Sequence, residues 1–375
     1  MVQTERISPR QLLLLIVSIK LSALTTYAPI ITATEKGVRD SWLAAILAGV
    51  TALGMTFLAC TLGAKFPRQT IFGYCETICG KLTGKTIGLT LICFFIYNTA
   101  LCLRTFTEFI LITLMPDTPL IVLTLAVMCI AAYMVRSGLE VIVRFNEIVG
   151  PPLLLSFPLL MILVAPNMDL NNLLPVLENG AKPMIIHALA PIGIFGEAVL
   201  VVLLALPVLD SPEKAKKAVL YGFLLNILLV STVAASIVAV FGPSHAAHLF
   251  FPTFSQIRMI SIANFLERLE TIMSILFILT MFVKTGFLFY GSLIGTAQLF
   301  NLKDYKPLVL PLAVVITSLS MFVVENIVEF REFCGPEYYA PFALTMEAGL
   351  PLFLIIVAAA RNYLSQTALK ETRSK

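Results

Sequence analysis

Apolar residues dominate ten stretches of this 375-residue chain, and short polar segments separate them. Most of these stretches reach the roughly 20 residues that a helix needs to cross a bilayer. Because lipid offers no hydrogen-bond partner to an open strand edge, we expect a helix in each. The ten predicted spans cover residues 11–33, 41–63, 87–115, 119–135, 145–165, 184–208, 216–241, 271–299, 307–326 and 340–361.

Two of the connecting loops carry an amphipathic pattern of their own. Residues 67–82 place Ile71, Cys75, Ile78 and Leu82 at helical spacing, which predicts a helix lying on the inner membrane face. Residues 243–270 contain a second short amphipathic stretch before the eighth span.

The amino-acid composition is typical of an integral membrane protein. Hydrophobic residues make up 58% of the chain and charged residues 13%, whereas a soluble domain is roughly 45–50% apolar and about 25% charged. No stretch outside the spans is long enough to fold alone, so we expect one transmembrane domain over residues 1–375. The first apolar run lacks a small-residue cleavage site and is predicted to be a span, not a signal peptide.

The distribution of Lys and Arg predicts the orientation. With the N-terminus inside, 17 of the 26 basic residues fall on inner segments and 6 on outer ones, while three lie within spans. Short cytoplasmic loops of membrane proteins carry such an excess, so we expect both termini in the cytoplasm.

Ten spans divide into two sets of five, from about 11 to 165 and from about 184 to 361. An odd number of spans per half makes the second half enter the membrane from the opposite side, as in many secondary transporters with inverted repeats. In such proteins the binding site is formed by interrupted helices at matching positions, here the first and sixth spans.

Both of these spans contain residues that favour an interruption. Pro29 follows the run Ser22-Ala23-Leu24-Thr25-Thr26, while Pro191, Gly193 and Gly196 lie close to Glu197. An unwound turn offers N–H groups to a carboxylate and carbonyl groups to an ammonium, which suits a zwitterionic amino acid. The alternative is that these small residues and prolines serve helix packing.

Five charged residues stand inside apolar stretches, where each is costly and marks a candidate functional position: Lys20, Arg104, Glu108, Glu197 and Lys284. Arg104 and Glu108 share one helical face, either as an ion pair or as a polar lining beside Tyr97. Two roles fit Glu197, a proton-linked carboxylate or a cap on an unwound turn. Lys284 either supplies a fixed positive charge in place of a sodium ion or pairs with Glu197 or Glu347, and Lys20 either reaches the inner face or pairs similarly.

Other classes of function find little support in the sequence. No Ser/His/Asp or Cys/His constellation and no phosphate-binding loop is evident, so we expect neither an enzyme nor a cofactor. Cys75 and Cys79 are four residues apart without a histidine cluster, which makes a metal site improbable. The net charge of +4 does not indicate nucleic-acid binding.

Five stretches together resemble the spore germination permease family, the B-type membrane subunits of nutrient germinant receptors within the amino acid–polyamine–organocation superfamily. They are LNNLLPVLENG at 170–180, FLERLE at 265–270, RTFTE at 104–108, FGE at 195–197 and KFPRQTIFGYCETICGKLTGK at 65–85. The resemblance covers essentially the whole chain. One departure is Ser22-Ala23-Leu24, where relatives often carry a Gly-x-Gly, because close approach of a ligand to the backbone is harder beside Leu24.

The resemblance implies a LeuT-like fold that holds its ligand between the first, third, sixth and eighth spans. It also implies the inner membrane of a bacterial spore, a complex with an A-type and a C-type subunit, and a small germinant such as an amino acid. The candidate ligand-binding residues are Ser22, Ala23, Leu24, Thr25, Thr26, Tyr97, Arg104, Glu108, Gly193, Phe195, Gly196, Glu197 and Lys284.

Two functions follow. The first is a sensor whose partner subunits respond to a ligand-induced change in its conformational equilibrium and trigger germination. The second is a proton-coupled amino acid permease with true transport activity.

An ion pair between Arg104 and Glu108 predicts that neutralising either residue harms folding more than exchanging the two side chains. The measurement is the yield of monodisperse protein after detergent extraction. An exchange as damaging as the single changes would argue against a simple pair.

Overall fold

The computed structural model describes the backbone of residues 5–31, 37–66, 69–260 and 269–373. Side chains are described within these ranges except at 23–31, 269–270 and 362–373. The calls on Ala23, Leu24, Thr25 and Thr26 therefore lie outside the described side chains, and most of FLERLE at 265–270 lies outside the described residues.

The described chain is helical throughout, apart from loops and one isolated bridge between Ile7 and Leu209. Its longer elements are α1 (Pro9–Ile31), α2 (Ser41–Lys65), α3 (Ile71–Cys79), α4 (Lys81–Thr113), α5 (Leu120–Arg136), α6 (Leu139–Val164), α7 (Ala181–Ala205), α8 (Ala215–Ala246), α9 (Pro252–Arg258), α10 (Leu269–Leu299), α11 (Val309–Phe322), α12 (Ile327–Phe333), α13 (Tyr339–Leu344), the π-turn η8 (Thr345–Gly349) and α14 (Leu350–Arg373).

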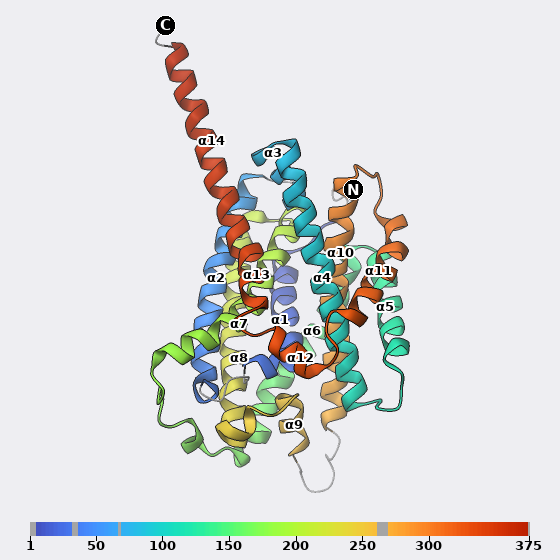
Figure 1. The fold of residues 1–375 in the computed structure, drawn as a ribbon, viewed down its shortest axis with the longest axis vertical. Coiled ribbons are helices and arrows are strands. Elements are labelled where there is room, and N and C mark those ends of the chain that lie inside the picture. The colour runs from blue at the N-terminus through green and yellow to red at the C-terminus, as the bar shows by residue number, and fades with distance from the viewer. Residues whose placement is uncertain (1–4, 32–36, 67–68, 261–268, 374–375) are drawn as a thin grey trace.

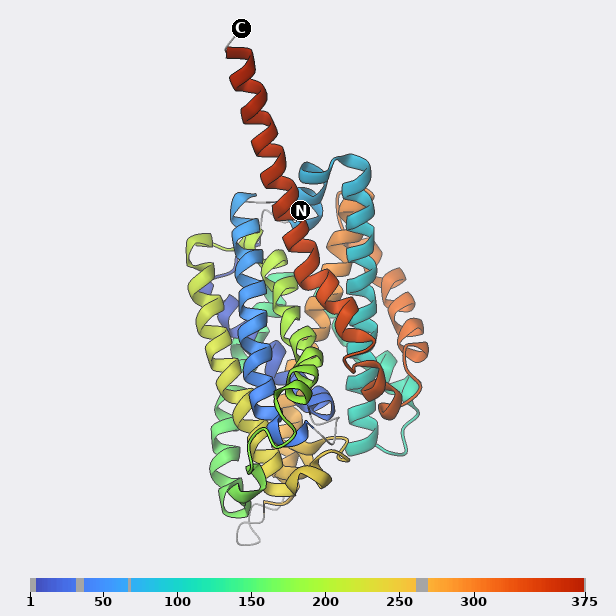
Figure 2. The same cartoon turned by 60° about the vertical axis from the view of Figure 1, so that its left-hand side comes forward.

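These helices form an elongated bundle, from one end of which α14 projects (Figures 1 and 2). Among the helices long and apolar enough to cross a membrane, α7 is the most buried, since 94% of its most apolar 18-residue stretch lies inside the protein. It packs along α2 and against α1 and α13, while α1 also contacts α6, α8 and α10. Helices α1 and α7 therefore meet inside the bundle, where their polar residues face protein and not lipid.

Helices occupy all ten predicted positions, but the number that clearly qualify as spans is smaller. By length and composition, seven described helical segments are long and apolar enough to cross a membrane. The number rises to eight if Lys306–Phe322 and Ile327–Phe333, which meet at a 95° bend, form one span. The predicted span at 119–135 is α5, an apolar helix of 17 residues that is shorter than these seven segments.

The predicted interruptions of the first and sixth spans are wrong. Helix α1 runs without a break from Pro9 to Ile31, and α7 runs from Ala181 to Ala205 with Pro191 inside it. The glycines of α7 serve close packing instead. A Cβ atom at Gly193 would lie 3.0 Å from the Cβ of Ala343, and one at Gly196 would lie 2.0 Å from Oε2 of Glu347.

The clearest break inside a described helix is in α8. Gly242 there has φ 70° and ψ 160°, and Pro243 follows it. Since Pro243 has no N–H group, the carbonyl of Ala239 loses its helical donor. It is satisfied from the 170–180 motif region, because the Asn172 side chain donates to it at 3.0 Å and the Asp169 backbone N–H at 3.0 Å. This motif therefore has a structural role, as a cap on an opened helix.

The amphipathic helix predicted in the loop at 67–82 is confirmed as α3. It lies against the start of α4, where a Cβ atom at Gly84 would come within 2.4 Å of the Glu76 Cα atom. Arg361 of α14 donates to the carbonyl groups of Thr77 and Ile78 at its C-terminal end. Helix α4 begins at Lys81, earlier than the predicted residue 87.

The N-terminal segment is fixed to the bundle before α1 begins. The Ile7 N–H donates to the Val208 carbonyl at 2.9 Å, and the Glu5 carboxylate accepts from the Leu139 N–H at 2.9 Å and the Tyr290 hydroxyl at 2.8 Å. These bonds hold the start of α1 against the start of α6, the turn that follows α7 and Tyr290 of α10.

We expect Gly196→Ala to lower the apparent Tm of the purified protein by several degrees, since overpacking typically costs about 1–3 kcal/mol. The matched control is Gly54→Ala in α2, where an added Cβ atom meets nothing within 4 Å. Alanine is the better helix former, so this control should leave the Tm unchanged or raise it. Equal Tm values for the two variants would contradict the packing role of Gly196.

Candidate functional site

Three of the predicted charged residues meet in the interior of the bundle. Lys20 comes from α1, Glu197 from α7 and Lys284 from α10, and their exposed fractions are 3%, 3% and 0%. The Oε2 atom of Glu197 lies 3.0 Å from Nζ of Lys20 and 3.0 Å from Nζ of Lys284. Of the two alternatives for each lysine, pairing with Glu197 is therefore confirmed.

Lys20 has a second bond that fixes its direction. Its ammonium group also donates to the backbone carbonyl of Ile194 in α7. An ammonium group carries three N–H donors, so Lys20 ties α1 to both the backbone and the side chain of α7. This buried cation therefore bonds α1 to α7 at two points.

A fourth charged residue, Glu347, completes the cluster. It is fully buried in the π-turn η8, and its carboxylate lies over the backbone of Gly196, one residue from Glu197. Within the described residues neither of its oxygens has a hydrogen-bond partner. π-turns often occur at functional sites, and this one brings a carboxyl group beside two ion pairs.

Charge balance links these four residues, which we call the central cluster (Lys20, Glu197, Lys284 and Glu347). The two lysines and Glu197 together carry one excess positive charge. If Glu347 is ionised as well, the net charge of the four residues is zero. A net charge buried in a low-dielectric interior costs several kcal/mol per ion in real proteins. The cluster can therefore exchange partners with a ligand that carries both charges, since the total charge stays unchanged.

The other predicted residues of the first and sixth spans make packing contacts or bonds within their own helix. Gly193 packs on Ala343 and Tyr339. Phe195 is buried, and its ring centroid lies 6.5 Å from that of Phe223 in α8. In the first span the Ser22 hydroxyl donates to the Ile19 carbonyl of its own helix at 2.9 Å.

A second polar group lies on α4. Arg104 and Glu108 form the predicted ion pair, with Nε of Arg104 3.3 Å from Oε2 of Glu108, and both side chains are nearly buried. Arg104 also donates to the backbone carbonyl of Glu325, between α11 and α12. This second bond changes our expectation for the exchange of the two side chains, because a glutamate at position 104 cannot donate to that carbonyl.

Tyr97, predicted beside this pair, contributes to an aromatic group. Its ring lies 5.9 Å from that of Phe333 and 6.1 Å from that of Phe342. The adjacent Asn98 accepts a hydrogen bond of 2.7 Å from the buried hydroxyl of Tyr339. Helix α4 is thereby joined to α12 and α13.

The candidate ligand-binding residues predicted from the sequence omit Asn98 and Glu347, although Glu347 is named there as a possible partner of Lys284. The signal for Glu347 was available, since it is a lone acidic residue within the apolar stretch 340–361. Its proximity to Glu197 was not, because it depends on Gly196 and on the π-turn.

In the described part of the chain, no group of three or more His, Cys, Asp or Glu residues is arranged to hold a metal ion. In α3, burial raises the pKa of the Cys75 thiol to about 12 and also raises that of Cys79. Both therefore stay protonated at neutral pH and are poor metal ligands.

Comparison with known proteins identifies the family. The model of the family described as "Spore germination protein" matches residues 6–328. Spore germination protein KB of Bacillus subtilis (strain 168) is 30% identical over 362 residues, which cover 94% of each chain. Spore germination protein YndE of the same strain is 23% identical over 360 residues, covering 96% of this chain and 98% of that protein. The chain belongs to the spore germination permease family and is a non-enzymatic, B-type membrane subunit.

Solved structures show the fold. Mhp1, a nucleobase-cation-symport-1 family transporter in a closed conformation with bromovinylhydantoin bound, superposes with a TM-score of 0.67 over 93% of this chain and 78% of its own, at 14% identity. MhsT in complex with L-phenylalanine gives a TM-score of 0.63 over 89% and 87%, at 16% identity. The chain thus has the LeuT-like transporter fold of an all-α, multi-pass membrane protein.

We expect Glu197→Gln to destabilise the protein more than Lys20→Met or Lys284→Met. Loss of the carboxylate leaves two buried ammonium groups without their shared partner, a change that typically costs about 3–5 kcal/mol, whereas loss of one lysine leaves the other pair intact. The measurement is the apparent Tm in one detergent at pH 7.

The control for this comparison is Glu140→Gln, which removes an exposed pair with Arg144. Surface pairs contribute about 0–1 kcal/mol, so its Tm should stay close to that of the wild type. A larger loss for either lysine variant than for Glu197→Gln would show that the lysines have other obligatory partners.

Proposed function

We propose that this protein is the ligand-sensing subunit of a germinant receptor and binds an amino acid at the central cluster. The observation that carries this proposal is the buried carboxyl group of Glu347, which has no hydrogen-bond partner within the described residues, beside Lys20, Glu197 and Lys284. Buried polar groups in proteins are nearly always hydrogen-bonded, so a group left without a partner is a candidate contact for a ligand.

A zwitterion fits both signs of charge in the cluster. Its ammonium group would bind Glu347, and its carboxylate would share the lysines with Glu197. MhsT, which has the same fold, binds L-phenylalanine. Because Gly196 has no side chain, the Glu347 carboxylate can lie against the α7 backbone beside Glu197, where both carboxylates are within reach of one ligand.

The proposed topology is ten spans in two inverted repeats of five, about 11–165 and about 184–361, within one domain over residues 1–375. The N-terminal segment and the projecting α14 lie toward the same end of the bundle, which supports an even number of spans (Figure 1). The excess of Lys and Arg predicts that this end is cytoplasmic. We place the protein in the inner membrane of the spore, together with A-type and C-type receptor subunits.

Sensing requires two conformations with different affinities for the ligand. Lys20 joins α1 to α7, and Glu197 joins both helices to α10. A ligand that displaces part of this network would change the relative position of three helices at once. Partner subunits bound to the surface of the bundle would respond to that change and trigger germination.

The alternative is a proton-coupled amino acid permease with true transport activity. The fold of Mhp1, a transporter, and two buried carboxyl groups in one cluster favour it. A carboxyl group that gains or loses a proton as the ligand binds would couple proton movement to transport. Uptake into proteoliposomes separates the two functions, because a sensor binds its ligand without accumulating it.

The test of ligand binding is a thermal-shift screen of the purified protein with the twenty amino acids, common sugars and monovalent cations. A ligand at about 100 times its Kd stabilises the folded state by about 2.7 kcal/mol, which gives a readily measured shift. We expect an amino acid to raise the Tm of the wild type and of the control Glu140→Gln, and to have no effect on Glu347→Gln.

Two outcomes would argue against this site. A shift that persists unchanged in Glu347→Gln would place the ligand elsewhere in the protein. A screen without any amino acid response, repeated on the complex with the A-type and C-type subunits, would exclude an amino acid as the ligand of this chain. For the permease, loss of pH-dependent uptake in Glu197→Gln with binding retained is the expected result.

A further inference from the structure

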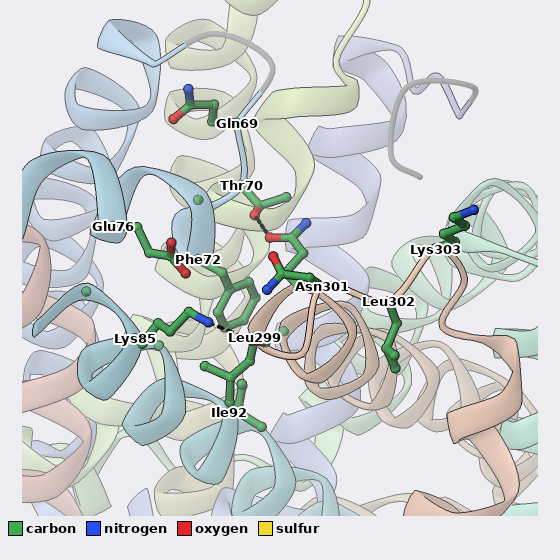
Figure 3. A pocket seen from close by; sticks show the side chains of 15 residues that line it. Gln69, Thr70, Phe72, Glu76, Lys85, Ile92, Leu299, Asn301, Leu302 and Lys303 are labelled. Carbon is green, nitrogen blue, oxygen red and sulfur yellow. Dashed lines mark hydrogen bonds between the residues drawn. The ribbon is translucent and has the colours of Figure 1, made fainter. Parts of the chain in front are cut away.

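A cavity of about 720 Å³ lies at the end of the bundle near the N-terminal segment, away from the central cluster. Its walls are α3, the first turns of α4, the last turn of α10 and residues 301–303 (Figure 3). Small-molecule sites typically enclose about 300–1,000 Å³, so this cavity has the size of a ligand site. None of the four central charged residues contributes to its lining.

Glycine residues line this cavity and allow an aromatic ring to form part of its apolar wall. A Cβ atom at Gly295 would lie 2.5 Å from the Phe72 ring, which shows how closely this ring packs on α10. Phe72 is 5% exposed, and a Cβ atom at Gly88 of α4 would lie 4.0 Å from its Cδ1 atom. Phe72 is thus clamped between α4 and α10, and Ile92 extends the apolar surface (Figure 3).

The lining contains one carboxylate and two ammonium groups, and of the two lysines Lys303 lies at the edge of the cavity with its side chain directed away from Glu76 and Lys85 (Figure 3). Glu76 comes from α3 and Lys85 from α4, and Figure 3 shows both side chains directed into the cavity. Within the described residues they form no ion pair with each other. Nζ of Lys85 donates to the Leu299 carbonyl at 3.3 Å, a long bond that uses one of its three N–H groups.

Amide groups line the side of the cavity formed by α10. Asn301 has a positive φ of 54°, and the N–H groups of Asn301 and Leu302 donate to the carbonyl groups of Gln298 and Ala297 at 3.1 and 2.8 Å. This is the Schellman arrangement, in which glycine is the usual residue at the position of positive φ. Asparagine tolerates the same conformation and adds a carboxamide to the cavity wall, beside Gln298, which accepts from the Thr70 hydroxyl.

We propose that this cavity is a second ligand site, which binds a zwitterion through Glu76 and Lys85. The ammonium group of the ligand pairs with Glu76 and its anionic group with Lys85, while its apolar part contacts Phe72. Two sources supply this chemistry, an ethanolamine phospholipid headgroup from the surrounding membrane and a free amino acid.

Separated opposite charges favour a zwitterion over a simple anion or cation. An anion alone would leave Glu76 facing it, and a cation alone would leave Lys85 facing it, each with repulsion. The amide groups of Asn301 and Gln298 suit either end of the ligand, because they offer both donors and acceptors. The site does not depend on the function proposed for the central cluster.

The first experiment uses the full-length protein and phospholipid probes. The purified protein is equilibrated in mixed micelles with equal amounts of phosphatidylethanolamine, phosphatidylcholine and phosphatidylglycerol, and retained lipid is counted by native mass spectrometry. For a lipid headgroup we expect phosphatidylethanolamine to be retained in preference, and Glu76→Gln and Lys85→Gln to reduce its retention about tenfold or more, as loss of a charge-assisted bond predicts.

The second experiment uses the twenty free amino acids in a thermal-shift assay with the same variants. For a free ligand we expect a shift in the wild type that is lost in Glu76→Gln and Lys85→Gln but retained in Glu347→Gln. A shift lost only in Glu347→Gln and retained in Glu76→Gln and Lys85→Gln belongs to the central cluster and argues against that amino acid as the ligand of this cavity, so the two sites are separable.

Matched controls keep both experiments decisive. Lys81→Gln and Glu140→Gln remove charges of the same sign outside the cavity lining and should leave binding unchanged. Gly88→Leu fills the cavity without changing any charge and should abolish binding of either source. Preferential retention of phosphatidylglycerol, or the absence of any probe whose binding requires both Glu76 and Lys85, would overturn the proposal.

Discussion

The polar interior of this protein depends on the sharing of one carboxylate by two buried lysines. Lys20, Glu197 and Lys284 come from three helices that are far apart in the sequence, and each is almost completely buried. Both ammonium groups contact the same oxygen of Glu197. Since each charge is too costly to bury alone, the three helices cannot separate without exposing an unpaired ion. The geometry of α1, α7 and α10 follows from this requirement.

Glycine determines what else can approach this point. Gly193 and Gly196 do not unwind α7; they let the segment from Tyr339 to Gly349 pack directly on its backbone. Glu347 thereby comes to lie beside Glu197, although the two residues belong to different spans. Glycine has the same effect at the end of the bundle. Gly84 allows α3 to lie close to α4, and Gly295 allows Phe72 to lie close to α10. At Gly196 the missing Cβ atom admits the Glu347 carboxylate, and at Gly84 it admits the backbone of Glu76.

The stretches of sequence that resemble the family are not always the ones that form the charged interior. The 170–180 region carries the most specific resemblance to the family, yet its Asn172 and Asp169 contacts satisfy a backbone carbonyl at the break in α8. Glu347, outside the quoted family stretches, lies in the charged centre. Arg104 illustrates a third case, since its pairing with Glu108 is local but its bond to Glu325 joins α4 to a distant loop.

The sequence alone determined the helices, the class of protein and the residues that carry charge into the interior. It did so because lipid leaves a backbone no alternative to the helix and makes every buried charge conspicuous. It also placed Arg104 and Glu108 within reach of each other, since residues four apart on a helix are neighbours wherever the helix lies, and the structure shows that they pair. Only the tertiary structure decided which helix stays straight and which opens, because Gly193 and Gly242 are equally permissive until their neighbours are known. The partners of Lys20 and Lys284, the place of Glu347 and the cavity beside Phe72 all arise from contacts between distant segments, which depend on how the helices pack.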